Sequence, residues 1–420
     1  MTSLALATLL GLSLCAAPKP AKLAPLPSQG DDFSESFSPG TPEEVGVDPH
    51  RLIALTRHLR DTPLPVYSLL ISRKGKLVYE LYTSSLGRDE AHYVMSVTKS
   101  VVSALVGIAV DEKLVRGPDA SVTDLLPRSF FQSDSDLERF RAITLTEVMG
   151  MSVLDAPVPP HKKTREARAR LAGFWACKDR VAFALSQPLL PEPGKDFQYT
   201  DLTPMIAVGV VQKAARMSAL EYAQARLFGP MRFKNVEWMH QDPTGFDNGG
   251  FGLRLRPVDM QKLGVLFLKG GEWEGKSLVS RAWVERSFTP WIRSRAALPA
   301  PNYGWYWWAR SWAPGFSAHL ASGWKGQRIA VIPEQELVVT MTAVIEDGTE
   351  DEAFTSLMRE FVVPAVSAKP LAPDAAARAE LAALLDEVRS APTRIKKGTE
   401  ERMIPTVAPK GTHRKYDNGK

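Results

Sequence analysis

Ser96 and Lys99 lie three residues apart at the start of the stretch YVMSVTKSVVSALVGIAVDEKLV, residues 93–115. On a helix, positions i and i+3 share one face about one turn apart, so the hydroxyl and the amine can meet. A hydroxyl becomes a nucleophile when a base takes its proton. A lysine can be that base if burial or neighbouring charge lowers its pKa toward neutrality. The stretch is apolar almost all round, which predicts a buried helix whose amine needs a partner or a task.

The S-x-x-K pattern alone is weak, because SGWK at Ser322 to Lys325 also fits it. We interpret that second copy as part of a strand, SGWKGQRIAVIP, whose glycines can bring backbone amides close to a bound acyl group. A further partner is PGKDFQYTDLTP, in which Tyr199 and Asp201 follow a Pro-Gly turn. A phenol is a plausible proton carrier between Ser96, Lys99 and a leaving group.

Several of these residues also have purely structural interpretations. Asp201 can cap the helix LTPMIAVGVV, and Trp324 can pack on the sheet instead of lining a pocket. His319 is interpreted as structural, because the chain contains no G-x-S-x-G turn for a Ser-His-Asp triad. Cys177, in the helical pattern GFWACKDRVAFAL, is expected to be a small core residue.

Over residues 41–365 the motifs, taken together and in order, resemble the serine hydrolases of the β-lactamase-like fold. That family includes class C β-lactamases, D-alanyl-D-alanine carboxypeptidases, related esterases and 6-aminohexanoate-dimer hydrolases. The segments that carry the resemblance are SVTKS, ITLTEVMGMSV, PGKDFQYTD, GGFGLRLRPVDMQKLG and SGWKGQRIAVIPEQELVV. SVTKS followed by GIAVDEKLV looks closest to the dimer-hydrolase branch.

The resemblance implies a role for each matching position. Ser96 would be the acylated nucleophile, Lys99 its base partner and Tyr199 the group that shuttles the proton to and from the leaving group. The oxyanion hole would consist of the backbone amides of Ser96 and Gln327, and Gly326 precedes the second of these. Such a donor is typically worth about 10²–10³ in rate. The resemblance implies no metal and no organic cofactor.

Two motifs depart from the family pattern. The family usually has Tyr-x-Asn where this chain has YTD, so Asp201 adds negative charge beside the substrate. The third motif usually begins with Lys or His in β-lactamases and peptidases, whereas Trp324 stands here. Lys325, one step along the expected strand, should point to the opposite face. A substrate carboxylate therefore loses its expected cation, which favours an esterase or an aminohexanoate-type amidase over a β-lactamase.

The order of elements predicts an α+β fold. Two strands surround RKGK (66–83), and a mainly helical region follows at about 116–249. We expect a turn and a long helix at 249–271, and then three strands near the end in NYGWYWWARSW, ASGWKGQRIAVIP and ELVVTMTAVI. This order indicates an antiparallel sheet assembled from both ends of the chain. We expect a hydrolase domain over 41–366. Its α/β part would cover about 41–115 and 250–366, and a C-terminal helix and basic tail would follow at 367–420.

Composition is that of a globular protein, with 44% hydrophobic and 24% charged residues. The formal net charge of +5 comes from the end of the chain, since residues 394–420 hold eight Lys or Arg against three Asp or Glu. The rest of the chain has 44 residues of each sign and is neutral. We therefore expect no nucleic-acid partner. The resemblance implies a small-molecule ester or amide as substrate. Nothing in the sequence indicates the oligomeric state.

The first 17 residues contain an uncharged apolar run that is too short to span a bilayer but suits a signal peptide, and a Pro-rich linker follows at 18–40. We therefore expect an exported protein, periplasmic or extracellular, without a stable membrane span. LSLC, ending at Cys15, resembles a lipoprotein box, although Leu14 is bulky for it. If the leader is not processed, the protein would be cytoplasmic.

The working hypothesis is a serine hydrolase that cleaves an ester or amide through an acyl-enzyme on Ser96. The alternatives are a D-Ala-D-Ala carboxypeptidase or weak β-lactamase, and a non-catalytic receptor of the same fold that binds a ligand or a cell-wall fragment. Intact Ser96, Lys99 and Tyr199 argue against the receptor. Fold analogy alone does not identify the acyl group.

Overall fold

The computed structural model describes residues 37, 40–83, 86–156, 165–239, 241–290, 302–346, 348–392 and 413–415. The expected leader at 1–17, nearly all of the linker at 18–40 and most of the basic tail lie outside the described residues.

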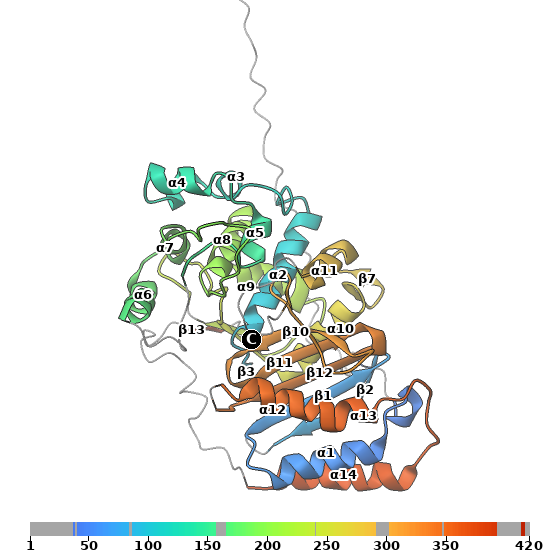
Figure 1. Ribbon diagram of the computed structural model, residues 1–420. Coiled ribbons are helices and arrows are strands. Elements are labelled where there is room, and N and C mark those ends of the chain that lie inside the picture. Colours follow the sequence, from blue (N-terminus) through green and yellow to red (C-terminus); the bar gives the residue numbers. More distant parts are fainter. Residues whose placement is uncertain are drawn as a thin grey trace, which may run out of the picture.

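The predicted hairpin around RKGK forms the start of the main sheet. Strands β1 (Val66–Arg73) and β2 (Lys76–Tyr82) pair antiparallel across a turn in which Lys74 and Gly75 have positive φ. The sheet has seven strands in the order β2-β1-β12-β11-β10-β9-β8, so the first strands of the chain pair with the last. This arrangement, visible in Figure 1, confirms the prediction of a sheet assembled from both ends.

The other strands of this sheet come from the last third of the chain. They are β8 (Asn302–Tyr303), β9 (Trp308–Ser311), β10 (Ser317–Gly323), β11 (Gln327–Ile332) and β12 (Leu337–Ala343). Every residue of β1, β11 and β12 is buried, which explains why these strands are apolar on both faces instead of alternating.

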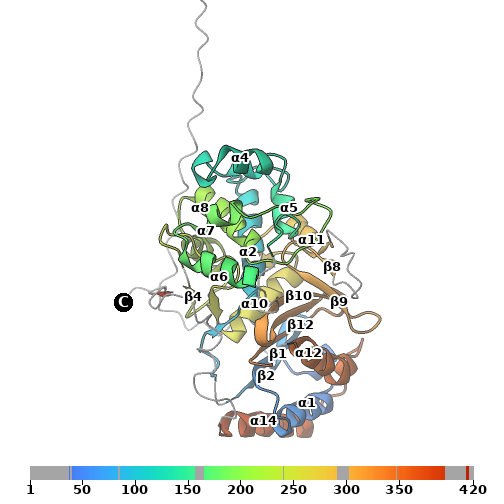
Figure 2. The same ribbon diagram turned by 60° about the vertical axis from the view of Figure 1, so that its left-hand side comes forward.

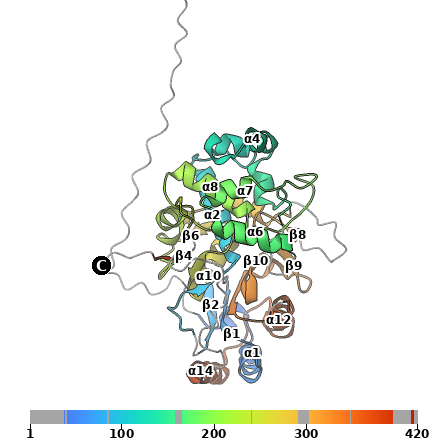
Figure 3. The ribbon, with the colours of Figure 1, turned by 90° about the vertical axis from the view of Figure 1, so that its left-hand side faces the viewer.

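Helices cover both faces of the sheet. Leu69 and Ile71 of β1 belong to the core shared with α1 (Pro49–Asp61) and α14 (Ala375–Ser390), whereas Leu70 between them packs with Val258 of α10 (Pro257–Leu268). In Figure 2 α1 and α14 lie together at the bottom of the molecule, and Figure 3 shows α12 (Glu350–Leu357) near them. The short α13 (Val363–Ala365) also contacts α1.

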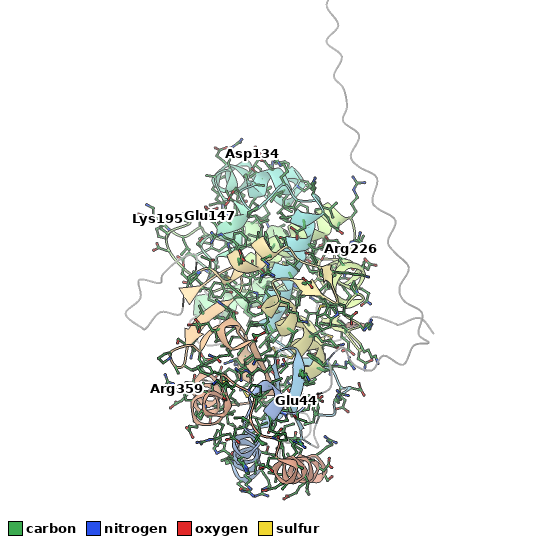
Figure 4. All side chains as sticks on the ribbon, turned by 90° about the vertical axis from the view of Figure 1, so that its right-hand side faces the viewer. Glu44, Asp134, Glu147, Lys195, Arg226 and Arg359 are labelled. Carbon is green, nitrogen blue, oxygen red and sulfur yellow. The ribbon has the colours of Figure 1, made fainter. Side chains whose placement is uncertain are left out.

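The middle of the chain forms the mainly helical region that the sequence predicts. It contains α3 (Val122–Leu125), α4 (Asp134–Phe140), α5 (Leu145–Met149), α6 (Arg165–Ala176), α7 (Arg180–Leu185), α8 (Thr203–Ala215) and α9 (Ala219–Ala223). Figure 4 shows Asp134, Glu147 and Lys195 at this end of the molecule, with Glu44 and Arg359 at the other. Helix α2 (Val97–Asp111) contacts both parts, namely α8 on one side and β10 and β11 on the other.

A second, small sheet lies beside the start of α2. Its strands, in the order β13-β4-β5-β3, are β13 (His413–Lys415), β4 (Glu237–Met239), β5 (Leu253–Leu255) and β3 (His92–Tyr93). Since β3 ends three residues before Ser96, this sheet fixes how the chain enters the helix. The sequence interpretation, which predicted only a turn and a helix at 249–271, missed β5.

Two segments predicted as single strands are hairpins. NYGWYWWARSW folds as β8 and β9 around Tyr306, whose φ is 64°. ASGWKGQRIAVIP folds as β10 and β11 around a turn at Trp324–Gly326. In ASGWKGQRIAVIP the glycines of GWKG are a turn signal that the single-strand interpretation overlooked, whereas the aromatic run of NYGWYWWARSW gives little sign of the reversal. At both reversals a residue other than glycine, Tyr306 or Lys325, adopts the left-handed conformation.

Within the described residues, no helix combines the length and apolar character needed to cross a bilayer.

Substituting Gly107 with valine is expected to destabilise the protein. A Cβ at Gly107 of α2 would lie 2.5–2.7 Å from the indole of Trp283, in α11 (Arg281–Phe288). That ring cannot easily move, because its Nε1 donates to Ser103 O at 2.9 Å. Overpacking of this kind costs about 1–3 kcal/mol.

We expect Gly107→Val to lower the free energy of unfolding in urea by about 2 kcal/mol. Gly87→Val is the matched control, since a Cβ there meets no atom within 4 Å and φ is not positive. Equal stability of the two variants would contradict the packing shown for α2 and α11.

Candidate active site

Ser96 lies at the N-terminus of α2, directly after a strained turn. Met95 has φ of 48°, a left-handed conformation that costs a non-glycine residue about 1–3 kcal/mol. Thr98 Oγ1 donates to Met95 O at 2.7 Å and accepts from Leu253 N of β5 at 3.1 Å. The turn is therefore tied to the small sheet, which holds the hydroxyl of Ser96 in one place.

The ammonium group of Lys99 is the centre of the site. Its Nζ lies 2.8 Å from Ser96 Oγ, 2.5 Å from Asp201 Oδ1 and 2.7 Å from Gly250 O. The side chain is only 1% exposed, so a charge there depends on these partners. The i, i+3 spacing thus brings Ser96 and Lys99 together as the sequence predicts.

The pKa of Lys99 differs from the sequence expectation. Burial by itself lowers the pKa of this amine, but the negative charge of Asp201 and the contact with Tyr199 outweigh burial and raise it. A lysine that removes the proton of Ser96 was expected to have a lowered pKa. In the resting site the charged form is favoured instead, and this corrects that premise.

Tyr199 lies in the segment before α8 and faces the same amine. The Lys99 Nζ is 4.9 Å from the centre of its ring. The ring stacks on Trp308 of β9, with centroids 5.3 Å apart, and meets Tyr303 edge-on. Tyr199 is half-buried, so the structure brings the three predicted groups together while leaving the phenol partly accessible.

Asp201 contacts Lys99 and does not cap α8. The residue before that helix is Leu202, and no side chain caps its N-terminus. The two interpretations left open for Asp201 are therefore resolved in favour of the contact with Lys99. The carboxylate is 19% exposed, which makes the pair largely but not wholly shielded from water.

Gly250 is a site residue that sequence reasoning missed. Its carbonyl accepts from Lys99, and a Cβ at this position would lie 2.9 Å from Asp201 Cβ, so only glycine fits. Asn248 Oδ1 accepts from Gly250 N at 2.9 Å and fixes the turn. A backbone acceptor has no side-chain signature. The only signal was the glycine pattern GGFG, which the resemblance already contained.

The third segment approaches Ser96 through Gly323. A Cβ there would lie 2.4 Å from Val94 O and 3.2 Å from Met95 Cβ, so the end of β10 touches the turn before Ser96. Gln327, the expected second oxyanion donor, begins β11 and pairs in register with Gly323. Gly326, with φ of 102°, completes the turn between them.

Trp324 and Lys325 lie in this turn and not on a strand. Trp324 is half-buried against Tyr93, Met95 and Met239, so it packs next to the turn that precedes Ser96. Lys325 has φ of 67°, and its Nζ lies 4.8 Å from the Trp324 ring centre. The prediction that Lys325 points to the opposite face of a strand is therefore wrong, because the turn breaks the alternation.

His319 is structural, as expected, whereas Cys177 is only half-buried just after the end of α6 and is not the core residue that the sequence predicts. The His319 ring stacks on Phe288 at 3.8 Å, and burial lowers its pKa to about 4, so it is neutral at physiological pH. Burial raises the pKa of the Cys177 thiol to about 11, which disfavours the reactive thiolate. In the part of the chain that the structure describes, no group of three His, Cys, Asp or Glu side chains could hold a metal ion.

Comparison with known proteins agrees with this geometry. The model of the beta-lactamase family matches residues 52–359, and the chain therefore belongs to that family. A 6-aminohexanoate-dimer hydrolase of Paenarthrobacter ureafaciens is 24% identical over 320 residues, which cover 72% of this chain and 79% of that protein.

Solved structures show the same fold. A penicillin-binding protein homologue from Caulobacter crescentus has a TM-score of 0.60 at 15% identity, with 76% of this chain and 99% of that chain covered. A simvastatin synthase mutant from Aspergillus terreus has a TM-score of 0.57 at 17% identity, with coverages of 75% and 97%. The predicted β-lactamase/transpeptidase-like fold is confirmed.

Replacing Asp201 with asparagine should lower the pKa of Lys99. The substitution keeps the shape but removes the charge that opposes burial, so burial then dominates. In the wild type the ammonium should persist to higher pH than in a free lysine, and in Asp201→Asn it should lose its proton at lower pH. NMR titration of isotope-labelled lysine measures both.

Asp196→Asn is the matched control, because Asp196 lies five residues earlier in the same segment and is not among the three acceptors of Lys99. An unchanged Lys99 titration in Asp201→Asn would show that Asp201 does not control the charge of the amine.

Proposed function

We propose that the protein is a serine hydrolase that cleaves an ester or amide bond through an acyl-enzyme on Ser96. The observation that carries the proposal is the contact of 2.8 Å between Ser96 Oγ and a buried amine that Asp201 and Gly250 hold in place. A hydroxyl that only began a helix would not need a buried charge beside it.

The three acceptors of Lys99 suit both of its protonation states. The ammonium donates one N–H to each of Ser96, Asp201 and Gly250. The neutral amine can donate to Asp201 and Gly250 and accept the proton of Ser96 through its lone pair. Proton transfer from the hydroxyl therefore breaks no contact and needs little rearrangement of the site.

In the acylation step, Ser96 Oγ forms a bond to the substrate carbonyl carbon while its proton passes to Lys99. Tyr199 then relays a proton to the leaving alcohol or amine as the ester or amide bond breaks. Water then attacks the carbonyl carbon of the acyl-enzyme and gives a proton to the same groups. They return a proton to Ser96 Oγ as the acyl bond breaks, which releases the acid. Because Asp201 favours the ammonium, the productive neutral form of Lys99 is a minority at neutral pH, and acylation should become faster as pH rises.

The developing negative charge on the carbonyl oxygen requires backbone donors. We place it between the amide of Ser96 at the N-terminus of α2 and an amide of the turn from Gly323 to Gln327. The close approach of Gly323 to Val94 and Met95 supports this position. The N-terminal end of a helix adds a favourable dipole for the same charge.

The charges around Ser96 favour a substrate without a carboxylate at the reacting end. Asp201 is negative where the family usually has an amide, and Lys99 is already paired with it. Trp324 occupies the position where β-lactamases and peptidases have a cation. An uncharged ester or an aminohexanoate-type amide therefore fits better than a penicillin. The resemblance to the dimer hydrolase supports the amide.

Labelling with a fluorophosphonate is the direct test of this proposal. The probe should modify the wild type on the peptide that contains Ser96, not on the one with Ser322, and Ser96→Ala should take no label. Loss of the nucleophile should lower turnover at least 10³-fold. A folded wild type that takes no label would favour the non-catalytic receptor.

The substrate class is tested on purified protein with p-nitrophenyl butyrate, the aminohexanoate dimer and nitrocefin. We expect ester or amide turnover to exceed nitrocefin turnover. Fast hydrolysis of nitrocefin without ester activity would support the peptidase or β-lactamase alternative instead.

We also propose that the protein is exported, on the basis of the apolar run at residues 1–17. Fractionation of cells that express the full chain should recover it outside the cytoplasm, with a new N-terminus near Pro18. A cytoplasmic protein that retains Met1 would contradict export without affecting the catalytic proposal.

A further inference from the structure

The turn between Gly323 and Gln327 joins two paired strand ends, and only its three central residues, 324–326, lie outside the ladder. Lys325 and Gly326 both have positive φ, and Trp324–Gly326 form a single turn of 3-10 helix between β10 and β11. Since residues 324–326 are not paired in the sheet, contacts from outside the turn contribute to fixing where its amides lie. The proposed oxyanion donor belongs to this segment, and a displacement of about 1 Å can cost on the order of 10²-fold in rate.

Two side chains hold the ends of the turn. The side-chain amide of Gln327 donates through Nε2 to Trp324 O at 3.1 Å and to Ala343 O at 2.6 Å. Its Oε1 accepts from Ala343 N at 3.2 Å. These bonds fasten the turn to β12. Arg328 Nη1 donates to Gly323 O at 2.6 Å and to Gln327 O at 2.9 Å. A single guanidinium nitrogen thus contacts both the first and the last residue of the turn.

Asp351 anchors this guanidinium group. Arg328 is 3% exposed, and its Nη2 donates to Asp351 Oδ1 at 2.6 Å. Burial lowers the pKa of Arg328, and the charge of Asp351 opposes that effect. Asp351 itself is 59% exposed in the first turn of α12, where the helix dipole favours a carboxylate. Arg328 of β11 therefore links the surface helix α12 to the backbone of Gly323, which packs on the turn before Ser96.

We propose that Arg328 and Asp351 are positioning residues that hold the turn from Gly323 to Gln327 against the turn at Val94 and Met95, which precedes Ser96. The inference rests on the proposed function, because it assigns the turn a role in binding the oxyanion. Neither residue touches the substrate. They act through Gly323, whose close approach to Val94 O leaves no room for displacement toward Ser96.

The test compares Asp351→Asn with Glu352→Gln. Glu352 is exposed in the same helical turn, and Glu352→Gln removes the same charge as Asp351→Asn. Among the described residues, no hydrogen bond joins Glu352 to Arg328. We expect Asp351→Asn to lower kcat for p-nitrophenyl butyrate about 10-fold, with KM unchanged within about twofold, because a misplaced donor affects the transition state most. Glu352→Gln should behave as the wild type.

Rates are expressed per labelled active site, so that an unfolded fraction does not count. Arg328→Lys should lose more than Asp351→Asn, since an ammonium cannot contact two carbonyls and a carboxylate in the same planar geometry. A lower melting temperature of Asp351→Asn with an unchanged kcat per labelled site would overturn the inference, because the pair would then be purely structural.

Amide hydrogen exchange gives a second measurement that does not depend on activity. In Asp351→Asn the amides of residues 323–327 should exchange faster than in the wild type and in Glu352→Gln, and unchanged exchange would overturn the positioning role. If the wild type takes no label and hydrolyses no substrate, the proposed function fails. The exchange experiment then still decides whether Arg328 and Asp351 position the turn.

Discussion

A single buried ammonium group constrains the arrangement of the whole site. Lys99 is almost completely enclosed, and an unpaired charge there would be strongly unfavourable. Its three contacts reach Ser96 in its own helix, Asp201 before α8 and Gly250 before β5. Three segments that are distant in sequence must therefore converge on one nitrogen atom. The same geometry that satisfies the charge places the hydroxyl of Ser96 next to a group that can take its proton.

The fold explains how these segments meet. α2 lies between the helical region and the main sheet, so its N-terminus faces residues from both. The helical region contributes Tyr199 and Asp201, and the sheet contributes the turn that ends β10. Because the sheet is built from both ends of the chain, the site forms only when the entire domain has folded. This is consistent with the large buried core that continues from α2 into both parts.

The sequence predicted those features of the site that depend on spacing along one element or on side-chain type. Ser96 and Lys99 meet because i and i+3 share a helix face, and Tyr199 and Asp201 follow a recognisable turn. Gly250 was missed because a carbonyl acceptor is present at every residue. The turn at Trp324 was misread because the segment was interpreted as one strand, although the two glycines of GWKG are a turn signal.

The charge of Lys99 shows a different limit of sequence reasoning. Burial and attraction to Asp201 act in opposite directions on its pKa, and the sequence gives neither the depth of burial nor the distance to the carboxylate. Only the contact at 2.5 Å decides that attraction prevails. The aspartate that stands in place of the family's usual asparagine therefore also raises the pKa of Lys99.

This pairing also has a consequence for specificity. With Asp201 bound to Lys99, the amine is neutralised locally and cannot also attract a substrate carboxylate. Trp324, in the place of the usual cation, contributes an apolar surface beside Met95. The two departures from the family pattern therefore act in the same direction. We infer that, in the proposed hydrolase, they retain the proton-transfer groups around Ser96 and remove a positive charge that would favour anionic substrates. Recognition would then come from the apolar and aromatic side chains around Ser96.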